Sequence, residues 1–121
     1  MLADSPKNVK EAMQSLSLNM QAVVNAAMLN DYGQIYKLAE KIENHEGPPI
    51  KHRLALLAEL KLDIANFKSF DDKVRANAIA MKEAAQNQNM KLILKEFGKI
   101  TEECINCHAI YRERIRRLNL N

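Results

Sequence analysis

The chain has 121 residues, which suits one domain with a single hydrophobic core. Hydrophobic residues make up 47% and aromatic residues only 5%, with three glycines and three prolines, which favours an all-α protein and argues against a β-sandwich. The net charge of +3 is mild, no basic run interleaved with aromatic residues indicates nucleic-acid binding, and no stretch approaches the roughly 20 apolar residues of a membrane span.

The first two helices are predicted from start and stop signals. One helix covers residues from about 6 to about 30, with Ser5 as its cap and Pro6 as its first helical residue. After the break "NDYG", Asn30 or Asp31 can cap a second helix from about 34 to 45. The stretch "EGPPI" ends this helix, because two consecutive prolines stop a helix.

Two more helices are predicted from apolar residues at helical spacing, one from about 52 to 87 and one from about 90 to 117. Asp71 interrupts the apolar stripe of the third helix, so we expect a local bend there with Phe70 on the inner face. Four amphipathic helices with short breaks predict an antiparallel up-down-up-down four-helix bundle, formed by a single domain of residues 1–121.

Both cysteines of the chain lie in "CINCH", residues 104–108. On a helix, Cys104, Cys107 and His108 stand at positions i, i+3 and i+4 and project from one face. The pattern C-x-x-C-H is typical of c-type haem attachment, because two thiols about one turn apart can add to the two vinyl groups of a porphyrin edge. The adjacent imidazole then lies under the iron as the proximal ligand. The motif predicts one haem c, bound covalently through two thioethers.

Three other interpretations of the cysteine pair remain. A disulfide is unfavourable because thiols at i and i+3 of a continuous helix rarely reach the required geometry. A thioredoxin-type pair needs a βαβ setting, for which this chain offers no strands. A structural zinc needs four ligands, and the remaining candidates, His45 and His52, flank the Pro-Pro break and are expected to be exposed loop residues.

The segment "EFGKITEECINCHAIYRERI" resembles the class II cytochromes c, the cytochrome c′ family, in its Phe-Gly pair, its C-x-x-C-H and the aromatic and basic residues that follow. "NMQAVVNA" in the first helix is a weaker match. The resemblance spans the chain in architecture but is specific only in the last helix and part of the first. It implies an exported, periplasmic protein whose signal peptide is absent from this chain. It also implies thioethers at Cys104 and Cys107, a proximal ligand at His108, a nearby basic residue at Arg112, and dimerisation through the first two helices.

Met13 and Met20 of the first helix are the candidates for a sixth iron ligand, as in the low-spin, Met-ligated branch of the family. In an up-down-up-down bundle the end of the last helix lies beside the start of the first. His108 is then level with about residue 14, which places Met13 opposite the iron, whereas Met20 lies about 10.5 Å further along the axis. Leu16 shields the distal side. The alternative for Met13 is that it fills the core, as methionine commonly does.

These observations predict a monohaem cytochrome rather than an enzyme. An iron ligated by His108 and Met13 would cycle between the ferric and ferrous states and pass single electrons to transiently docking redox proteins. The arginines from Arg112 to Arg117 are expected to steer an acidic partner. The alternative is a five-coordinate haem protein of the cytochrome c′ type, which binds nitric oxide or carbon monoxide at an open distal site.

Overall fold

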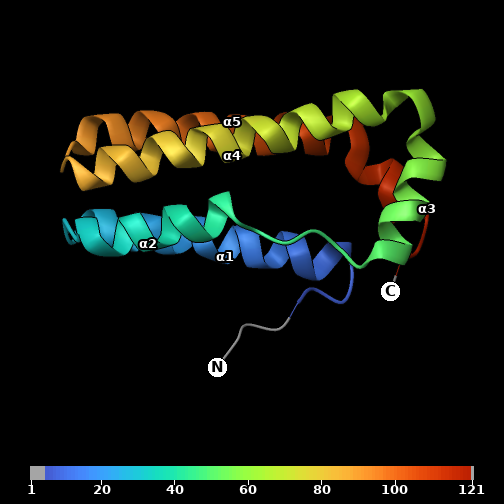
Figure 1. The fold of residues 1–121 in the computed structure, drawn as a ribbon, viewed down its shortest axis with the longest axis horizontal. Coiled ribbons are helices and arrows are strands. Elements are labelled where there is room, and N and C mark those ends of the chain that lie inside the picture. Colours follow the sequence, from blue (N-terminus) through green and yellow to red (C-terminus); the bar gives the residue numbers. More distant parts are fainter. Residues whose placement is uncertain (1–4, 121) are drawn as a thin grey trace.

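The computed structural model describes residues 5–120, so residues 1–4 and 121 of the expected single domain lie outside the described residues. The elements in chain order are α1 (Val9–Met28), α2 (Tyr32–Glu43), α3 (Ile50–Leu60), the short 3₁₀ helix η1 (Lys61–Asp63), α4 (Ile64–Gln86) and α5 (Met90–Arg116) (Figure 1). No strand occurs in residues 5–120, and the predicted all-α fold is confirmed. None of the described helices has the length and apolar character needed to cross a membrane.

Four of the helices pack together. The closely packed pairs are α1 with α2, α2 with α4, and α4 with α5. In Figure 1, α1 and α2 form one layer and α4 and α5 the other, while α3 lies across one end of the bundle. In the described part of the chain, α1 does not pack closely against α5. One side of the four-helix arrangement is therefore more loosely packed than the other three.

Short polar side chains cap the start of three helices. The side-chain oxygens of Asn8, Asp31 and Asn89 accept hydrogen bonds of 2.9, 3.0 and 3.1 Å from the backbone N–H three residues later. Such caps satisfy one of the N–H groups that a helix start leaves without a partner. The first helix consequently begins at Val9, after Asn8, and not directly after Ser5 as expected.

The segment expected to form one helix from about 52 to 87 is divided at Lys61. This residue has a φ of 50°, and the chain turns there from α3 through η1 into α4. Phe70 packs against the buried ring of Tyr111, and Asp71 lies inside the uninterrupted helix α4. Its place on the apolar stripe is explained by side-chain partners, since His45 and Arg75 both bond its carboxylate.

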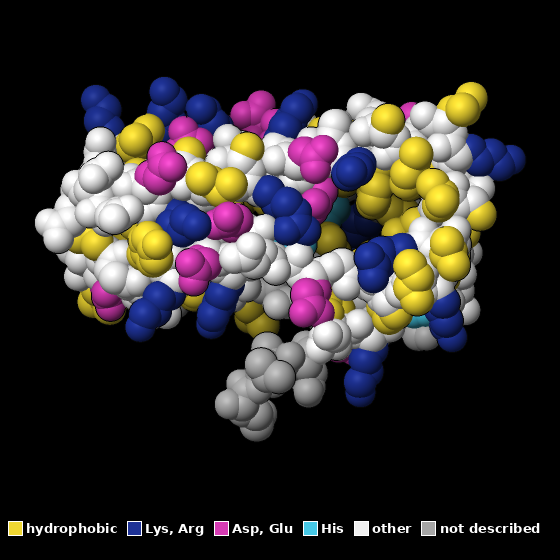
Figure 2. Space-filling view, in the orientation of Figure 1, with side chains coloured by type: hydrophobic (Ala, Val, Ile, Leu, Met, Phe, Trp, Pro, Cys, Tyr) yellow, Lys and Arg dark blue, Asp and Glu magenta, His cyan; other side chains and the backbone are white. Residues whose placement is uncertain are grey.

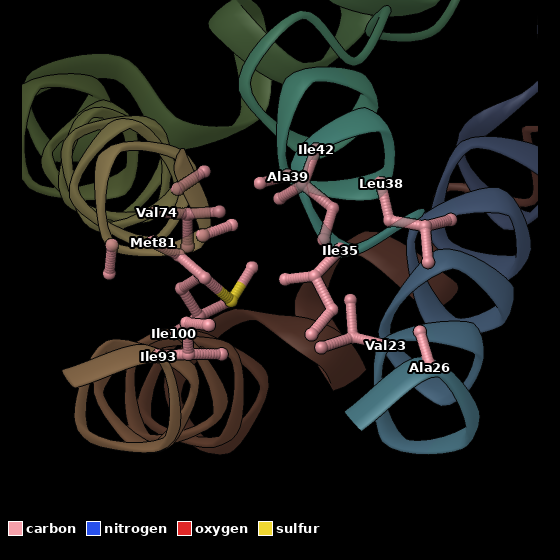
Figure 3. Close-up of a cluster of buried hydrophobic side chains, with 13 residues drawn as sticks. Val23, Ala26, Ile35, Leu38, Ala39, Ile42, Val74, Met81, Ile93 and Ile100 are labelled. Carbon is pink, nitrogen blue, oxygen red and sulfur yellow. The ribbon is translucent and has the colours of Figure 1, made fainter. Parts of the chain in front are cut away.

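The hydrophobic core lies between the four packed helices (Figure 3). It extends from the α1–α2 and α4–α5 connections as far as Val23 on α1 and Ile100 on α5. Beyond these two residues, the described part of α1 buries only Ala12, and that of α5 buries only Tyr111. The core consists of Val23, Ala26, Ile35, Leu38, Ala39, Ile42, Val74, Ala78, Met81, Ala84, Ala85, Ile93 and Ile100. The start of α1 and the end of α5 are thus bound together by few buried apolar side chains.

Candidate functional site

Helix α5 carries the C-x-x-C-H motif without interruption. Cys104 and Cys107 are free thiols and are half-buried, and Cys104 packs against the hydrophobic core. His108, one residue further on, is exposed. Because residues at i, i+3 and i+4 of a helix are neighbours on its surface, α5 presents two thiols and one accessible imidazole together.

Tyr111 fixes the rotation of α5 at the motif. Its buried ring meets the ring of Phe67 edge-on with centroids 5.2 Å apart, and that of Phe70 with centroids 6.3 Å apart. The side-chain amide of Asn66 donates a 2.6 Å hydrogen bond to the Tyr111 hydroxyl. All three partners belong to α4, so this face of α5 is held against α4 one turn beyond the cysteines.

Arg114 holds the neighbouring flank of α5 against η1 and α3. Its guanidinium bonds the carboxylate of Asp63 at 3.1 Å and the backbone carbonyl of Glu59 at 3.2 Å. At about 100° per residue, Arg114 and His108 lie about 60° to either side of Tyr111. His108 therefore stands on the flank of α5 opposite to the one that contacts α3 and η1, consistent with its exposure.

Both thiols are held in the protonated form. Burial, followed by the negative charge of Glu103, raises the pKa of Cys104. Burial, followed by the charges of Cys104, Asp71 and Glu103, raises the pKa of Cys107 to about 11. The thiolate is the form that binds metals and exchanges disulfides, so these two reactions are suppressed at neutral pH. Within residues 5–120 no cluster of three or more His, Cys, Asp or Glu side chains could hold a metal ion.

The two candidate iron ligands on α1, Met13 and Met20, differ in their surroundings. Met13 is 40% exposed and does not belong to the core. Met20 and Leu16 are half-buried and pack against the core. Met13 therefore does not fill the core, whereas Met20 does so in part.

The side chains of the C-x-x-C-H motif are chemically suited to a haem, a flat and largely apolar group, carried on α5. Helix α5 supplies two free thiols and the exposed imidazole of His108. Met13 is 40% exposed on α1, a helix that is not closely packed against α5. Figure 2 also shows a hollow beside α3, bordered by apolar side chains, with histidine atoms visible inside it.

The basic cluster at the end of α5 is partly neutralised. Arg114 pairs with Asp63 and Glu59, and Arg116 and Arg117 both pair with Glu113, as ion pairs of the described chain. Arg112, one turn after His108, is exposed. The positive charge available to steer an acidic partner is consequently smaller than the count of arginines suggests.

A polar cluster that the sequence did not reveal joins the α2–α3 connection to α4. His45 donates from Nε2 to Asp71 Oδ1 at 2.6 Å, and Arg75 donates from Nε to Asp71 Oδ2 at 2.7 Å. Arg75 also donates to the backbone carbonyls of Glu43 and His45. The sequence does indicate the pairing of Asp71 with Arg75, because oppositely charged residues four apart on a helix are neighbours. It does not indicate the bond from His45, because His45 is 26 residues from Asp71.

Neither histidine beside the Pro-Pro break is an exposed loop residue, so that expectation was wrong. The side chain of His45 is only 10% exposed because of its bond to Asp71. His52 is buried, because α3 begins at Ile50 and turns this residue toward the bundle together with Leu56 and Leu60. Among the described residues, the Nδ1 atom of His52 has no hydrogen-bond partner.

In comparisons of sequence and of fold, no family model, curated protein or solved structure matches this chain. The function is therefore inferred from the C-x-x-C-H motif and from the way in which α5 and α1 present their side chains.

Proposed function

We propose that the protein is a monohaem c-type cytochrome of the class II kind that carries single electrons and is not an enzyme. The observation that carries this proposal is the motif on α5, where two free thiols and an exposed imidazole lie on an unbroken helix that α1 does not closely cover. Haem c, when bound, supplies an iron that alternates between the ferric and ferrous states.

The roles of the α5 residues follow from their chemistry. Cys104 and Cys107 hold the porphyrin through two thioethers, so that it cannot dissociate. His108 would be the proximal iron ligand, and its side chain is exposed. Tyr111 and Arg114 are positioning residues, because their bonds to α4, η1 and α3 fix the rotation of α5 about its axis. Arg112 supplies a cation on the proximal side.

Met13 is the sixth ligand in this proposal, and its sulfur is available because the side chain is 40% exposed and takes no part in the core. A neutral, soft thioether favours the ferrous state and raises the reduction potential. Leu16, half-buried one turn later, excludes water from the distal side. In the alternative function, Met13 does not bind the iron and Leu16 lines an open distal site. The protein would then be five-coordinate and would bind nitric oxide or carbon monoxide.

The proposal includes an antiparallel up-down-up-down arrangement of α1, α2, α4 and α5. The connections at residues 29–31 and 87–89 support it, because links this short join antiparallel neighbours. The placement of the start of α1 and the end of α5 at the same end of the bundle in Figure 1 also supports it. This arrangement would bring Met13 and His108 to one end of the molecule.

Location and partners follow from the chemistry of attachment. Covalent haem attachment outside the cytoplasm implies a periplasmic protein whose partners are redox proteins that dock transiently. The exposed apolar residues Leu18, Met28 and Leu29 on and beside α1 support a homodimer formed through α1 and α2.

The test is the optical spectrum of the protein, purified after expression with the haem-attachment machinery, in the ferric and ferrous states with and without carbon monoxide. We expect a low-spin spectrum that carbon monoxide does not change, and a high-spin, carbon monoxide-binding spectrum in Met13→Ala. Met28→Ala is the matched control, because Met28 is an exposed methionine of the same helix.

Other outcomes separate the alternatives. A high-spin wild type that binds carbon monoxide would replace electron transfer by gas binding as the function. Cys104→Ser and Cys107→Ser should each lose one thioether, which mass spectrometry of the denatured chain measures. A chain that acquires no covalent haem would contradict both functions.

A further inference from the structure

Helix α3 has one face that the rest of the protein covers. The side chains of His52, Leu56 and Leu60 recur every four residues and are buried against the bundle. Since α3 lies across the end of the bundle (Figure 1), the opposite face of this helix points away from the molecule along its long axis.

The helix surface about 130° around the axis from the buried side chains, at about 100° per residue, is apolar. Ile50, Leu54 and Leu57, at positions i, i+4 and i+7, are between 49% and 63% exposed, and Leu62 in η1 is 99% exposed. Figure 2 shows apolar side chains gathered over this end of the molecule. Residues at this spacing form one continuous strip along a helix. We call this strip, with Leu62, the outer face of α3.

Exposed cations border the outer face of α3. Lys51 and Arg53 lie on opposite sides of the apolar strip, given about 100° per residue, and Lys61 follows the end of the helix. The acidic residue of this helix, Glu59, is paired with Arg114 of α5. The cations Lys51, Arg53 and Lys61 thus make the border of the apolar strip positive, while Glu59 faces Arg114 within the protein.

We propose that the outer face of α3 binds the surface of an anionic lipid bilayer. A helix with an apolar face flanked by basic residues lies in the plane of a membrane, with its apolar side chains at the boundary of headgroups and acyl chains. Lys51, Arg53 and Lys61 meet the lipid phosphates, and each cation near such a surface strengthens binding about fivefold. The bundle then stands end-on, because α3 crosses its end.

Charge favours this occupant over a second copy of the chain. Two outer faces in contact would bring Lys51 and Arg53 of one molecule against those of the other, and like charges across an interface are unfavourable. An anionic surface instead compensates all three cations. The inference goes beyond electron transfer and does not depend on the haem.

The test is co-sedimentation of the full chain with vesicles of phosphatidylglycerol and phosphatidylcholine in equal parts, beside vesicles of phosphatidylcholine alone. We expect binding to the anionic vesicles that weakens as salt is added. Leu54→Ser/Leu57→Ser should abolish it, and Lys51→Gln/Arg53→Gln should weaken it about 25-fold, from about fivefold for each charge. Leu92→Ser/Leu94→Ser, which changes two exposed leucines of α5, is the matched control and should bind as the wild type does.

Three results would overturn the proposal. They are equal binding to both kinds of vesicle, undiminished binding by Leu54→Ser/Leu57→Ser, and no binding at all. If the wild type fails to bind and forms a dimer that Leu54→Ser/Leu57→Ser abolishes in sedimentation equilibrium, the outer face of α3 is a self-association surface instead. Circular dichroism of each variant verifies the fold, which these exposed positions should leave intact.

Discussion

The Nε2 atom of His45 lies 2.6 Å from Oδ1 of Asp71, and the Nδ1 atom of the same ring lies 2.6 Å from the backbone carbonyl of Ile42. One imidazole therefore bridges the end of α2 and the middle of α4. Arg75 completes the bridge through the other carboxylate oxygen.

This bridge predicts an acid-sensitive contribution to stability. Burial raises the pKa of Asp71, but the hydrogen bonds and charges of His45 and Arg75 outweigh it and lower the pKa from 3.8 to about 2. The unfolded chain then binds more protons between these values, so the contribution is present above about pH 4 and is lost as the pH falls toward 2. Because the Asp71 side chain is 42% exposed, solvent screening limits the effect to about 1 kcal/mol.

Urea unfolding measured from about pH 6 to about pH 2 checks this prediction. The free energy of unfolding of Asp71→Asn should fall less with acid than that of the wild type. Asp72→Asn, which changes the exposed neighbour, should behave as the wild type does. Curves for the wild type and Asp71→Asn that run parallel over this range would contradict the role of the bridge.

Tyr111 should contribute to stability in two separable ways. Tyr111→Phe removes the hydrogen bond from Asn66 and keeps the ring contacts with Phe67 and Phe70, so we expect a loss of about 1 kcal/mol. Tyr111→Ala also empties the buried site and should cost about 3–5 kcal/mol. Urea denaturation measures both, with the exposed substitution Ile110→Ala as a control expected to lie within about 0.5 kcal/mol of the wild type. Equal losses of unfolding free energy in Tyr111→Phe and Tyr111→Ala would show that the ring contacts make no separate contribution.

The turn at Lys61 should be stabilised by glycine. Lys61 has φ 50° and ψ −118°, which a side chain with a Cβ atom adopts at a cost. Lys61→Gly should therefore raise the free energy of unfolding by about 1 kcal/mol. Lys68→Gly, at an exposed position inside α4, should lower it by about 1 kcal/mol. Thermal unfolding should give shifts of opposite sign, and a loss in both variants would mean that the conformation of Lys61 is not strained.

The cysteine thiols should react slowly in the folded chain. The pKa of Cys107 is raised from 9.0 to about 11 by burial and by the charges of Cys104, Asp71 and Glu103, so its thiolate fraction near pH 8 is about a hundredfold below that of an unfolded chain. Alkylation by iodoacetamide, followed at Cys107 by mass spectrometry in protein without haem, should show about this ratio between folded and urea-unfolded chains. The rate should still rise with pH above 9 in the folded chain. A plateau near pH 9 would contradict the raised pKa.

The helices and their starts were largely readable from the sequence, because they depend on local patterns. Asp31 was identified as a candidate cap, and apolar spacing predicted four helical segments. The division of the third segment at Lys61 was not readable, since neither glycine nor proline marks it and apolar residues continue at helical spacing on both sides. The turn arises because α3 must cross the bundle end to bury Leu56 and Leu60, which is a tertiary effect.

The candidate site likewise combines a local pattern that the sequence shows with long-range contacts that it does not. The cysteine and histidine spacing that predicts haem attachment is confined to five residues, so the sequence alone displays it. The contacts that orient α5 are long-range. Asn66 and Tyr111 are separated by 45 positions in the sequence, and Asp63 and Arg114 by 51. Periodicity predicts that Tyr111 faces inward but not which side chains receive it.

The packing of α1 bears on how a large molecule could reach α5 at all. Detaching α1 breaks one closely packed helix pair, that with α2. It withdraws the buried side chains of Ala12, Val23 and Ala26 and the partly buried ones of Leu16 and Met20. Detaching α2 or α4 would break two such pairs. The amide hydrogens of α1 should therefore exchange with solvent sooner than those of α4, through local opening well below the free energy of global unfolding. If the proposed haem is bound, such an opening would give it a path to Cys104 and Cys107 while α4 and α5 stay paired, and its attachment would then not require the remaining helices to unfold.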